Sequence, residues 1–153
     1  MDRLINSTCR LLEMTIVVLL ATMVILVFGN VVARYGFNSG ITVSEEVSRW
    51  LFIWMTFLGA VIALKEHGHL GVDIVIGRLP TGGKKACLVL GHLLMLYIVV
   101  LMLKGSWEQA VINWDVAAPV TGAPLAIVYA AGIVFSVISG VLIAMDLYRL
   151  FTG

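Results

Sequence analysis

The stretch Pro124 to Met145, PLAIVYAAGIVFSVISGVLIAM, contains no charged residue and is long enough to cross a lipid bilayer as a helix. Three further apolar runs of similar length occupy residues 14–33, 47–64 and 86–103. None of them alternates between apolar and polar residues as a barrel strand does, and each is about twice as long as such a strand. The sequence therefore predicts an all-α integral membrane protein, with four transmembrane helices in a single membrane domain of residues 1–153.

The overall composition favours the same class. Of 153 residues, 61% are hydrophobic and 12% are charged, whereas a soluble domain carries about 45–50% apolar and about 25% charged residues. So little charge cannot cover a globular surface, which excludes most soluble enzyme folds. The net charge of +1 provides no basic stripe, so nucleic acid is not an expected partner. The two cysteines are interpreted as small apolar fillers.

Lysine and arginine are distributed unequally between the two ends of the four runs. The N-terminus, the loop 65–85 and the C-terminus together hold seven of these residues, and the other side holds Arg34, Arg49 and Lys104. Because basic residues remain on the cytoplasmic side, we expect both termini in the cytoplasm. The first run is longer than the apolar core of a cleaved signal peptide, so it is interpreted as an uncleaved anchor helix.

Two short amphipathic segments are expected to lie at the membrane surface. Residues 70–79 are too apolar for a solvated loop and too short to cross the bilayer. The second segment begins at Thr42 and leads into the second run, and Thr42-x-x-Glu45 has the spacing of a helix capping box. In this segment Glu45 and Arg49 share a helix face, and Glu46 lies beside them near the positive end of the helix dipole.

Tryptophans mark the expected ends of the spans. Trp50 and Trp54 are four residues apart and suit the bilayer interface. The predicted outer loop 104–123 contains two more tryptophans, which either lie at the same interface or form a docking surface for a periplasmic partner. The residues of this second group are Trp107, Trp114 and Asp115.

Small residues recur at helical spacing inside two of the runs. In lipid such residues let helices approach each other closely. They are interpreted as helix packing positions, either within the bundle of this chain or against another chain. They are Gly59 and Ala63 in the second run and Gly132, Ser136 and Gly140 in the fourth.

The middle of the four runs is almost free of ionisable residues, and His92 is one or two turns inside the third run. A transporter that moved ions by itself would place more polar groups at the midplane. We therefore expect a scaffold or accessory subunit without a cofactor. The irregular spacing of His67, His69 and Asp73 does not favour a metal site. His69 and Asp73 are instead expected to anchor the inner interfacial segment.

Several motifs follow one another along the chain. Asn30-Val-Val-Ala-Arg34-Tyr35 leads into Ser44-Glu45-Glu46-x-x-Arg49, and three later groups are Phe57-Leu58-Gly59-Ala60 with Ala63-Leu64-Lys65, His69-x-x-Val72-Asp73, and Pro119-x-x-Gly122-x-Pro124. In their order and spacing, and across all four runs, these motifs resemble the small membrane subunit of tripartite ATP-independent periplasmic (TRAP) transporters, the DctQ-like family.

The resemblance implies a non-catalytic subunit of the bacterial inner membrane. It would scaffold a large elevator-type membrane subunit for the sodium-coupled uptake of an organic acid, such as a dicarboxylate or sialic acid. A periplasmic substrate-binding protein would be a transient partner, and membrane lipids would surround the helices. We expect a polar cluster near the outer surface to fix the first and second helices, formed by Arg34, Glu45, Glu46 and Arg49.

Two other classes stay open from the residues alone. One is a haem-carrying membrane anchor of an oxidoreductase, although His92 has no evident partner for bis-histidine ligation. The other is a small self-sufficient exporter, for which Glu13 at the cytoplasmic edge is the nearest candidate carboxylate. The helix that would face a large subunit is also left open.

Overall fold

The structure of the protein is a computed structural model that describes residues 2–67 and 81–152. Four long helices make up almost all of it, and each is long and apolar enough to cross a membrane. They are α1 (Asp2–Gly36), α2 (Thr42–His67), α4 (Thr81–Ile112) and α5 (Ala126–Thr152). The predicted fold class of four transmembrane helices is thereby confirmed. The interfacial segment predicted at residues 70–79, with His69 and Asp73, lies outside the described residues.

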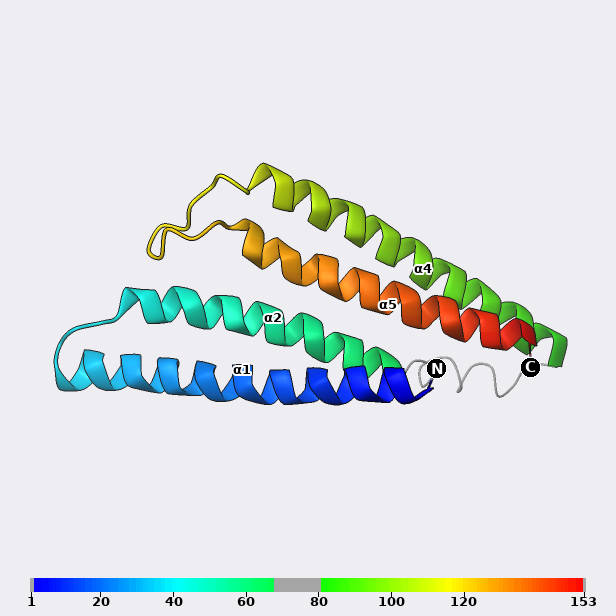
Figure 1. Ribbon diagram of the computed structural model, residues 1–153, viewed down its shortest axis with the longest axis horizontal. Coiled ribbons are helices and arrows are strands. Elements are labelled where there is room, and N and C mark those ends of the chain that lie inside the picture. Colours follow the sequence, from blue (N-terminus) through cyan, green and yellow to red (C-terminus); the bar gives the residue numbers. More distant parts are fainter. Residues whose placement is uncertain (1, 68–80, 153) are drawn as a thin grey trace.

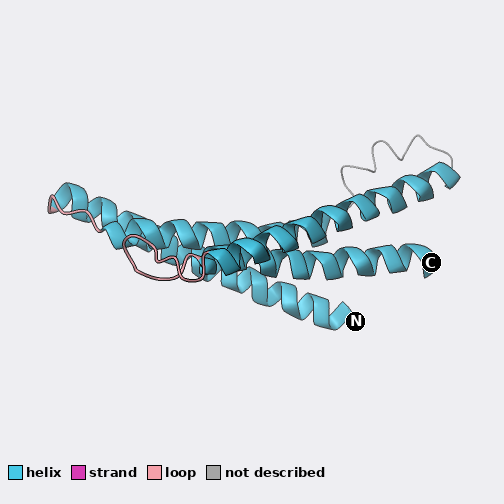
Figure 2. Cartoon of the chain, turned by 90° about the horizontal axis from the view of Figure 1, so that it is seen from above, coloured by secondary structure: helices cyan, strands magenta, loops and turns pink. Residues whose placement is uncertain are grey.

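The four helices form two hairpins, α1 with α2 and α4 with α5, which meet where α2 packs against α5. Figure 1 shows the resulting order in space, α1, α2, α5 and α4. The two connections that the structure describes, residues 37–41 and 113–125, lie at one end of the bundle, which we call the loop end. The start of α1 and the end of α5 lie at the opposite end, as Figure 2 also shows.

All four helices have boundaries that differ from the predicted spans, and the differences at α2 and α4 change the assignment of polar residues. The helix α2 begins at Thr42 rather than 47, so the expected amphipathic entry is part of the spanning helix. The helix α4 continues to Ile112 rather than 103, and its added turns carry the exposed pair Lys104 and Glu108, four residues apart. The predicted outer loop 104–123 is therefore helical in its first half. Hydropathy marks the apolar part of a helix, and such polar turns extend a helix beyond it.

The turn after α1 depends on Asn38, which has a left-handed conformation with φ of 52°. Asparagine tolerates this conformation because its short polar side chain bonds locally. The backbone N–H groups of Phe37 and Ser39 both donate to the carbonyl of Ala33, at 3.0 and 3.2 Å, and close the end of α1. The chain then reverses into α2 within five residues, which keeps the first hairpin tight.

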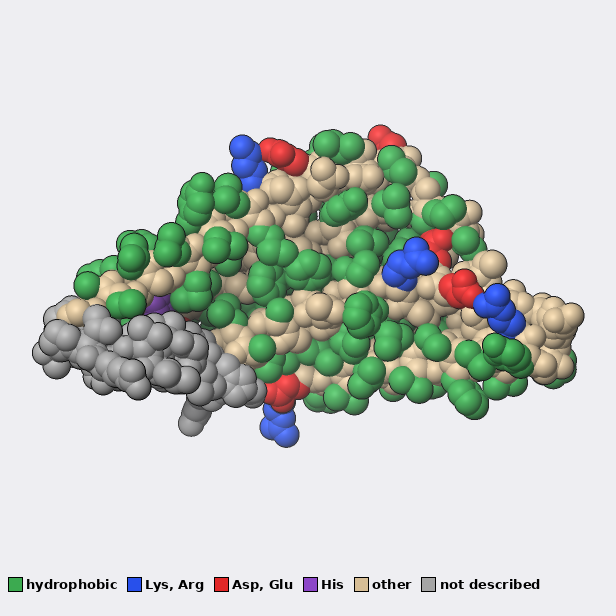
Figure 3. Space-filling model, turned by 180° about the vertical axis from the view of Figure 1, so that it is seen from behind, with side chains coloured by type: hydrophobic (Ala, Val, Ile, Leu, Met, Phe, Trp, Pro, Cys, Tyr) green, Lys and Arg blue, Asp and Glu red, His purple; other side chains and the backbone are tan. Residues whose placement is uncertain are grey.

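The seam between α2 and α5 forms the centre of the molecule. Phe57 of α2 lies against Phe135 of α5 with ring centroids 5.6 Å apart. Val61 and Ala131, each four residues from one of these rings, are buried. The Trp54 indole N–H donates to the carbonyl of Ile127 at 3.2 Å. The share of each span that is buried is 33% for α5 and 6% for α1, so the outer helices leave most of their apolar surface uncovered. Figure 3 shows apolar side chains over most of one face, with few charged ones among them.

The contact between α4 and α5 depends on a glycine. A Cβ at Gly132 would collide with the side chain of Ser106 on α4, and a Cβ at Gly140 would lie 3.5 Å from Cγ1 of Val99. Ser136, one turn after Gly132, is buried and donates to the Gly132 carbonyl at 2.7 Å. Small residues at this spacing bring the two backbones close together, which increases van der Waals contact in lipid.

We predict that Gly132→Val destabilises the chain, because the added side chain forces α5 away from α4. Overpacking of this kind costs about 1–3 kcal/mol. Gly91→Val in α4 is the matched control, since a Cβ at Gly91 meets nothing within 4 Å. Thermal unfolding of each variant in detergent micelles measures the effect, and equal melting temperatures for the two variants would contradict the assignment.

Candidate functional site

The polar side chains at the loop end join the helices rather than line a reaction centre. Asn30 of α1, in an otherwise apolar stretch, is buried. The side-chain NH₂ group of Asn30 donates to Oε1 of Glu45 at 3.1 Å. The side-chain oxygen Oδ1 of Asn30 accepts a bond from the backbone N–H of Ile41 at 2.7 Å. Asn30 therefore connects α1 both to the turn before α2 and to the first turn of α2.

Two further groups strengthen the contact between α1 and α2. The hydroxyl of Ser44 donates to the carbonyl of Leu26 at 2.7 Å. Arg34 approaches Glu45 with 3.9 Å between the guanidinium nitrogen and Oε1, and both side chains are largely exposed. An exposed ion pair of this length contributes little to stability, so the amide and hydroxyl bonds carry this contact.

Glu46 faces the other hairpin. Its side chain is buried, with 7% of the residue exposed, and its carboxylate accepts bonds from the loop between α4 and α5. The donors are the backbone N–H of Val120 at 3.0 Å, the hydroxyl of Thr121 at 2.6 Å and the backbone N–H of Thr121 at 3.4 Å. Bonds to an ionised carboxylate are stronger than neutral ones. A single side chain of α2 thus holds the loop that belongs to the second hairpin.

The loop is shaped to present these donors. The N–H of Ala118 donates to the carbonyl of Ala123 at 2.8 Å, and that of Leu125 donates to Val116 at 3.0 Å. Gly122 closes the narrow turn with φ of 70°, a value that favours glycine. The turn directs its backbone N–H groups at Glu46, where they form a small cradle for one carboxylate.

The four residues predicted as one polar cluster do not form a single group. Arg34 of α1 and Glu45 of α2 meet where these two helices face each other. Glu46 instead faces the second hairpin. The guanidinium of Arg49 is exposed and has no partner among the described residues. The spacing Thr42-x-x-Glu45 predicts a capping box, in which Glu45 would bond to the start of its own helix. In the structure the Glu45 carboxylate instead accepts a bond from the side chain of Asn30.

The remaining predicted residues of α2 are two tryptophans and two small residues. Trp50 is half-buried, and Trp54, about halfway along α2, contributes the inter-helix bond to α5. Gly59 has nothing within 4 Å of a Cβ position and Ala63 is exposed, so this pair does not pack against another described helix. Its role in packing stays a prediction for a contact outside the chain.

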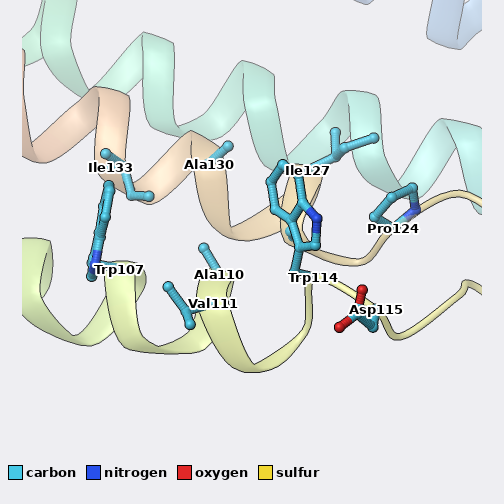
Figure 4. Close-up of a pocket in the computed structure, with 10 residues that line it drawn as sticks. Trp107, Ala110, Val111, Trp114, Asp115, Pro124, Ile127, Ala130 and Ile133 are labelled. Atoms are coloured by element: carbon cyan, nitrogen blue, oxygen red, sulfur yellow. The ribbon is translucent and has the colours of Figure 1, made fainter.

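A groove of about 640 Å³ lies between the end of α4 and the start of α5. It contains the predicted group Trp107, Trp114 and Asp115, and its other lining residues are apolar (Figure 4). Both tryptophans are more than half exposed. Trp107 lies near Ile133 and Trp114 near Ile127. The structure thus brings the three residues together along one groove, without assigning them a partner.

The fold and these contacts define a class. This is a multi-pass membrane protein whose polar groups at the loop end connect its own helices. Residues 23–153 match the family model of the DctQ component of tripartite ATP-independent periplasmic transporters. The chain belongs to this family, whose members are transporter components that work with a large membrane subunit and are not enzymes.

Similar proteins agree with this assignment. The chain is 44% identical over 135 residues, 88% of its length and 81% of the relative, to a protein of Haemophilus influenzae named as a TRAP transporter small permease. It is 35% identical over 96 residues, 63% of its length and 41% of the relative, to the C4-dicarboxylate TRAP transporter small permease protein DctQ of Vibrio cholerae. A match of 37 residues, 40% identical, covers 24% of this chain and 6% of the isethionate TRAP transporter permease protein DctMQ of Oleidesulfovibrio alaskensis.

We predict that Glu46→Gln loosens the loop of residues 118–123, because one acceptor oxygen is replaced by an NH₂ group that cannot accept. Hydrogen exchange of the Val120 and Thr121 amides should rise about tenfold, in keeping with about 1.5–3 kcal/mol for a bond to a charged group. Glu45→Gln is the control, since its carboxylate binds Asn30 instead. Unchanged exchange in Glu46→Gln, or equal changes in both variants, would contradict the assignment.

Proposed function

We propose that this subunit is a non-catalytic scaffold for the large, elevator-type subunit of its transporter. The observation that supports this proposal is the position of the charged residues of this chain. In the described residues they lie near the helix ends. The buried hydroxyls of Ser136 and Ser139 lie near the middle of α5, and the ring of His92 lies about two turns inside the span of α4. Ion and proton pathways through membranes need ionisable groups at depth. A frame instead needs tight packing and fixed helix ends, which the Gly132 contact and the Glu46 bonds supply.

We further propose that the complex imports an organic anion with sodium across the bacterial inner membrane, with both termini of this chain in the cytoplasm. Two relatives are named for C4-dicarboxylate and isethionate, which carry carboxylate or sulfonate groups. A dicarboxylate or sialic acid fits this chemistry. The bias of lysine and arginine toward the terminal end supports the orientation.

A periplasmic substrate-binding protein is the proposed transient partner of the loop end. Trp107, Trp114 and Asp115 lie beside the loop that Glu46 holds, and they offer an exposed surface of aromatic rings and one carboxylate. Exposed aromatic residues are enriched where proteins meet. Membrane lipids cover the remaining apolar faces of the outer helices.

Reconstitution into liposomes tests the scaffold function. This chain alone should give no uptake of a labelled dicarboxylate or sialic acid. Uptake should require the large subunit, the binding protein and an inward sodium gradient, and should disappear when potassium replaces sodium. Uptake by this chain alone would overturn the proposal, and so would failure of the chain to co-purify with the large subunit.

We predict that the double change Glu45→Gln and Glu46→Gln lowers both the yield of the complex and the rate of uptake. The contact between α1 and α2 loses the Glu45 carboxylate, and the contact between the two hairpins loses the Glu46 carboxylate. Glu108→Gln is the matched control, since the exposed Glu108 carboxylate pairs only loosely with Lys104, at 3.9 Å. Recovery of the complex by affinity purification and uptake in proteoliposomes measure the effect. Wild-type values in the double variant would remove these carboxylates from the scaffold.

A further inference from the structure

One exposed side of α2 consists mainly of small and charged residues. Its residues follow one another at steps of three or four, which places them on one side of the helix. All of them are exposed, although α2 is flanked by α1 and α5. We call this row the α2 stripe, and it consists of Glu45, Arg49, Phe52, Thr56, Ala60 and Ala63.

Beyond Phe52 the α2 stripe carries only small side chains, and Gly59 beside it has open space around a Cβ position. The exposed surfaces of α1 and α4 are covered by large apolar residues instead, for example Val18 and Ile25 on α1 and Leu94 on α4. Large apolar side chains suit contact with acyl chains, whereas small ones let a second helix approach closely. The stripe therefore has the character of a helix contact and not of a lipid contact.

The charged residues at the loop end of the α2 stripe favour a partner helix with an acidic residue. Arg34 and Arg49 lie on this side with Glu45 as the one carboxylate, which leaves an excess positive charge. Arg49 has no partner among the described residues. A guanidinium on a membrane-spanning face is costly unless it is paired or reaches water. A carboxylate on the partner helix at the same depth in the membrane as Arg49 would supply the missing negative charge.

A polar pocket adjoins the stripe between α1 and α2. Its volume is about 310 Å³, and Glu45 belongs both to its lining and to the stripe. Ser48 also lines the pocket, with 8% of the residue exposed, and its buried hydroxyl has no hydrogen-bond partner among the described residues. Buried hydroxyls are normally bonded, so this one is available to a polar side chain that enters the pocket.

From these observations we propose that a transmembrane helix of the large subunit packs along the α2 stripe, with a carboxylate paired to Arg49 and a polar side chain in the Ser48 pocket. The proposal rests on the scaffold function and adds which face of the chain meets the large subunit. The outer surfaces of α1 and α4 then face lipid.

Site-specific photo-crosslinking in the assembled complex tests this assignment. A benzoyl-phenylalanine at Ala60 should crosslink to the large subunit. The same probe at Leu94 on α4 or Val18 on α1 should yield at least tenfold less of that product. A crosslink to the large subunit from Leu94 or Val18 but not from Ala60 would overturn the proposal, and so would a probe at Ala60 that captures only phospholipid. In either case, intact co-purification would leave the scaffold function standing.

Two variants extend the test to the chemistry. Ala60→Trp should reduce recovery of the complex at least tenfold, and Leu94→Trp should not, with monodisperse elution of each chain alone as the check on folding. Arg49→Glu should reduce recovery as well, and Arg49→Lys should retain most of it. If Arg49→Glu assembles like wild type, no carboxylate of the large subunit pairs with Arg49. If even the wild-type chains fail to assemble, the scaffold function and this assignment fail together.

Discussion

The packing of α2 against α5 is the contact on which the rest of the molecule depends, because it is where the two hairpins join. At its loop end the buried carboxylate of Glu46 holds the turn around Thr121, and about two and three turns deeper Trp54 and Phe57 meet α5. In a bilayer, helices gain little from the hydrophobic effect, so such hydrogen bonds and close packing must hold them together. With these contacts in place, α1 and α4 need only pack on one neighbour each.

Much of this fold follows from the sequence because a bilayer imposes strict lengths on apolar runs. The ends of the helices do not follow in the same way. The polar turns after Leu103 remain helical because the exposed side chains of Lys104 and Glu108 are satisfied on the helix surface, where hydropathy gives no signal. Likewise α2 begins at Thr42, before its apolar run, since the turn that precedes it is fixed by Asn30 from another helix.

The candidate site was predictable in part. Glu45 and Glu46 stand out as carboxylates beside an apolar run, but neighbouring residues of a helix point about 100° apart and so meet different partners. The partners of Glu46 are mainly backbone N–H groups of a loop distant in sequence, which no residue pattern reveals. Asn30 carried a usable signal, since a polar amide inside an apolar helix requires a partner. Family membership identifies a TRAP transporter small permease subunit, and its geometry places the described charged residues near helix ends and small residues along the contact between α4 and α5.

The proposed scaffold function requires this chain to stay fixed while the large subunit moves. Double electron–electron resonance between spin labels at Val17 on α1 and Val141 on α5, two exposed positions, tests it directly in the assembled transporter with Cys9 and Cys87 replaced by serine. A fixed scaffold should give one distance distribution that is unchanged when sodium and solute are added, while labels on the large subunit change their separation. A distribution that shifts or splits with transport conditions would contradict it, since the two hairpins would then move against each other.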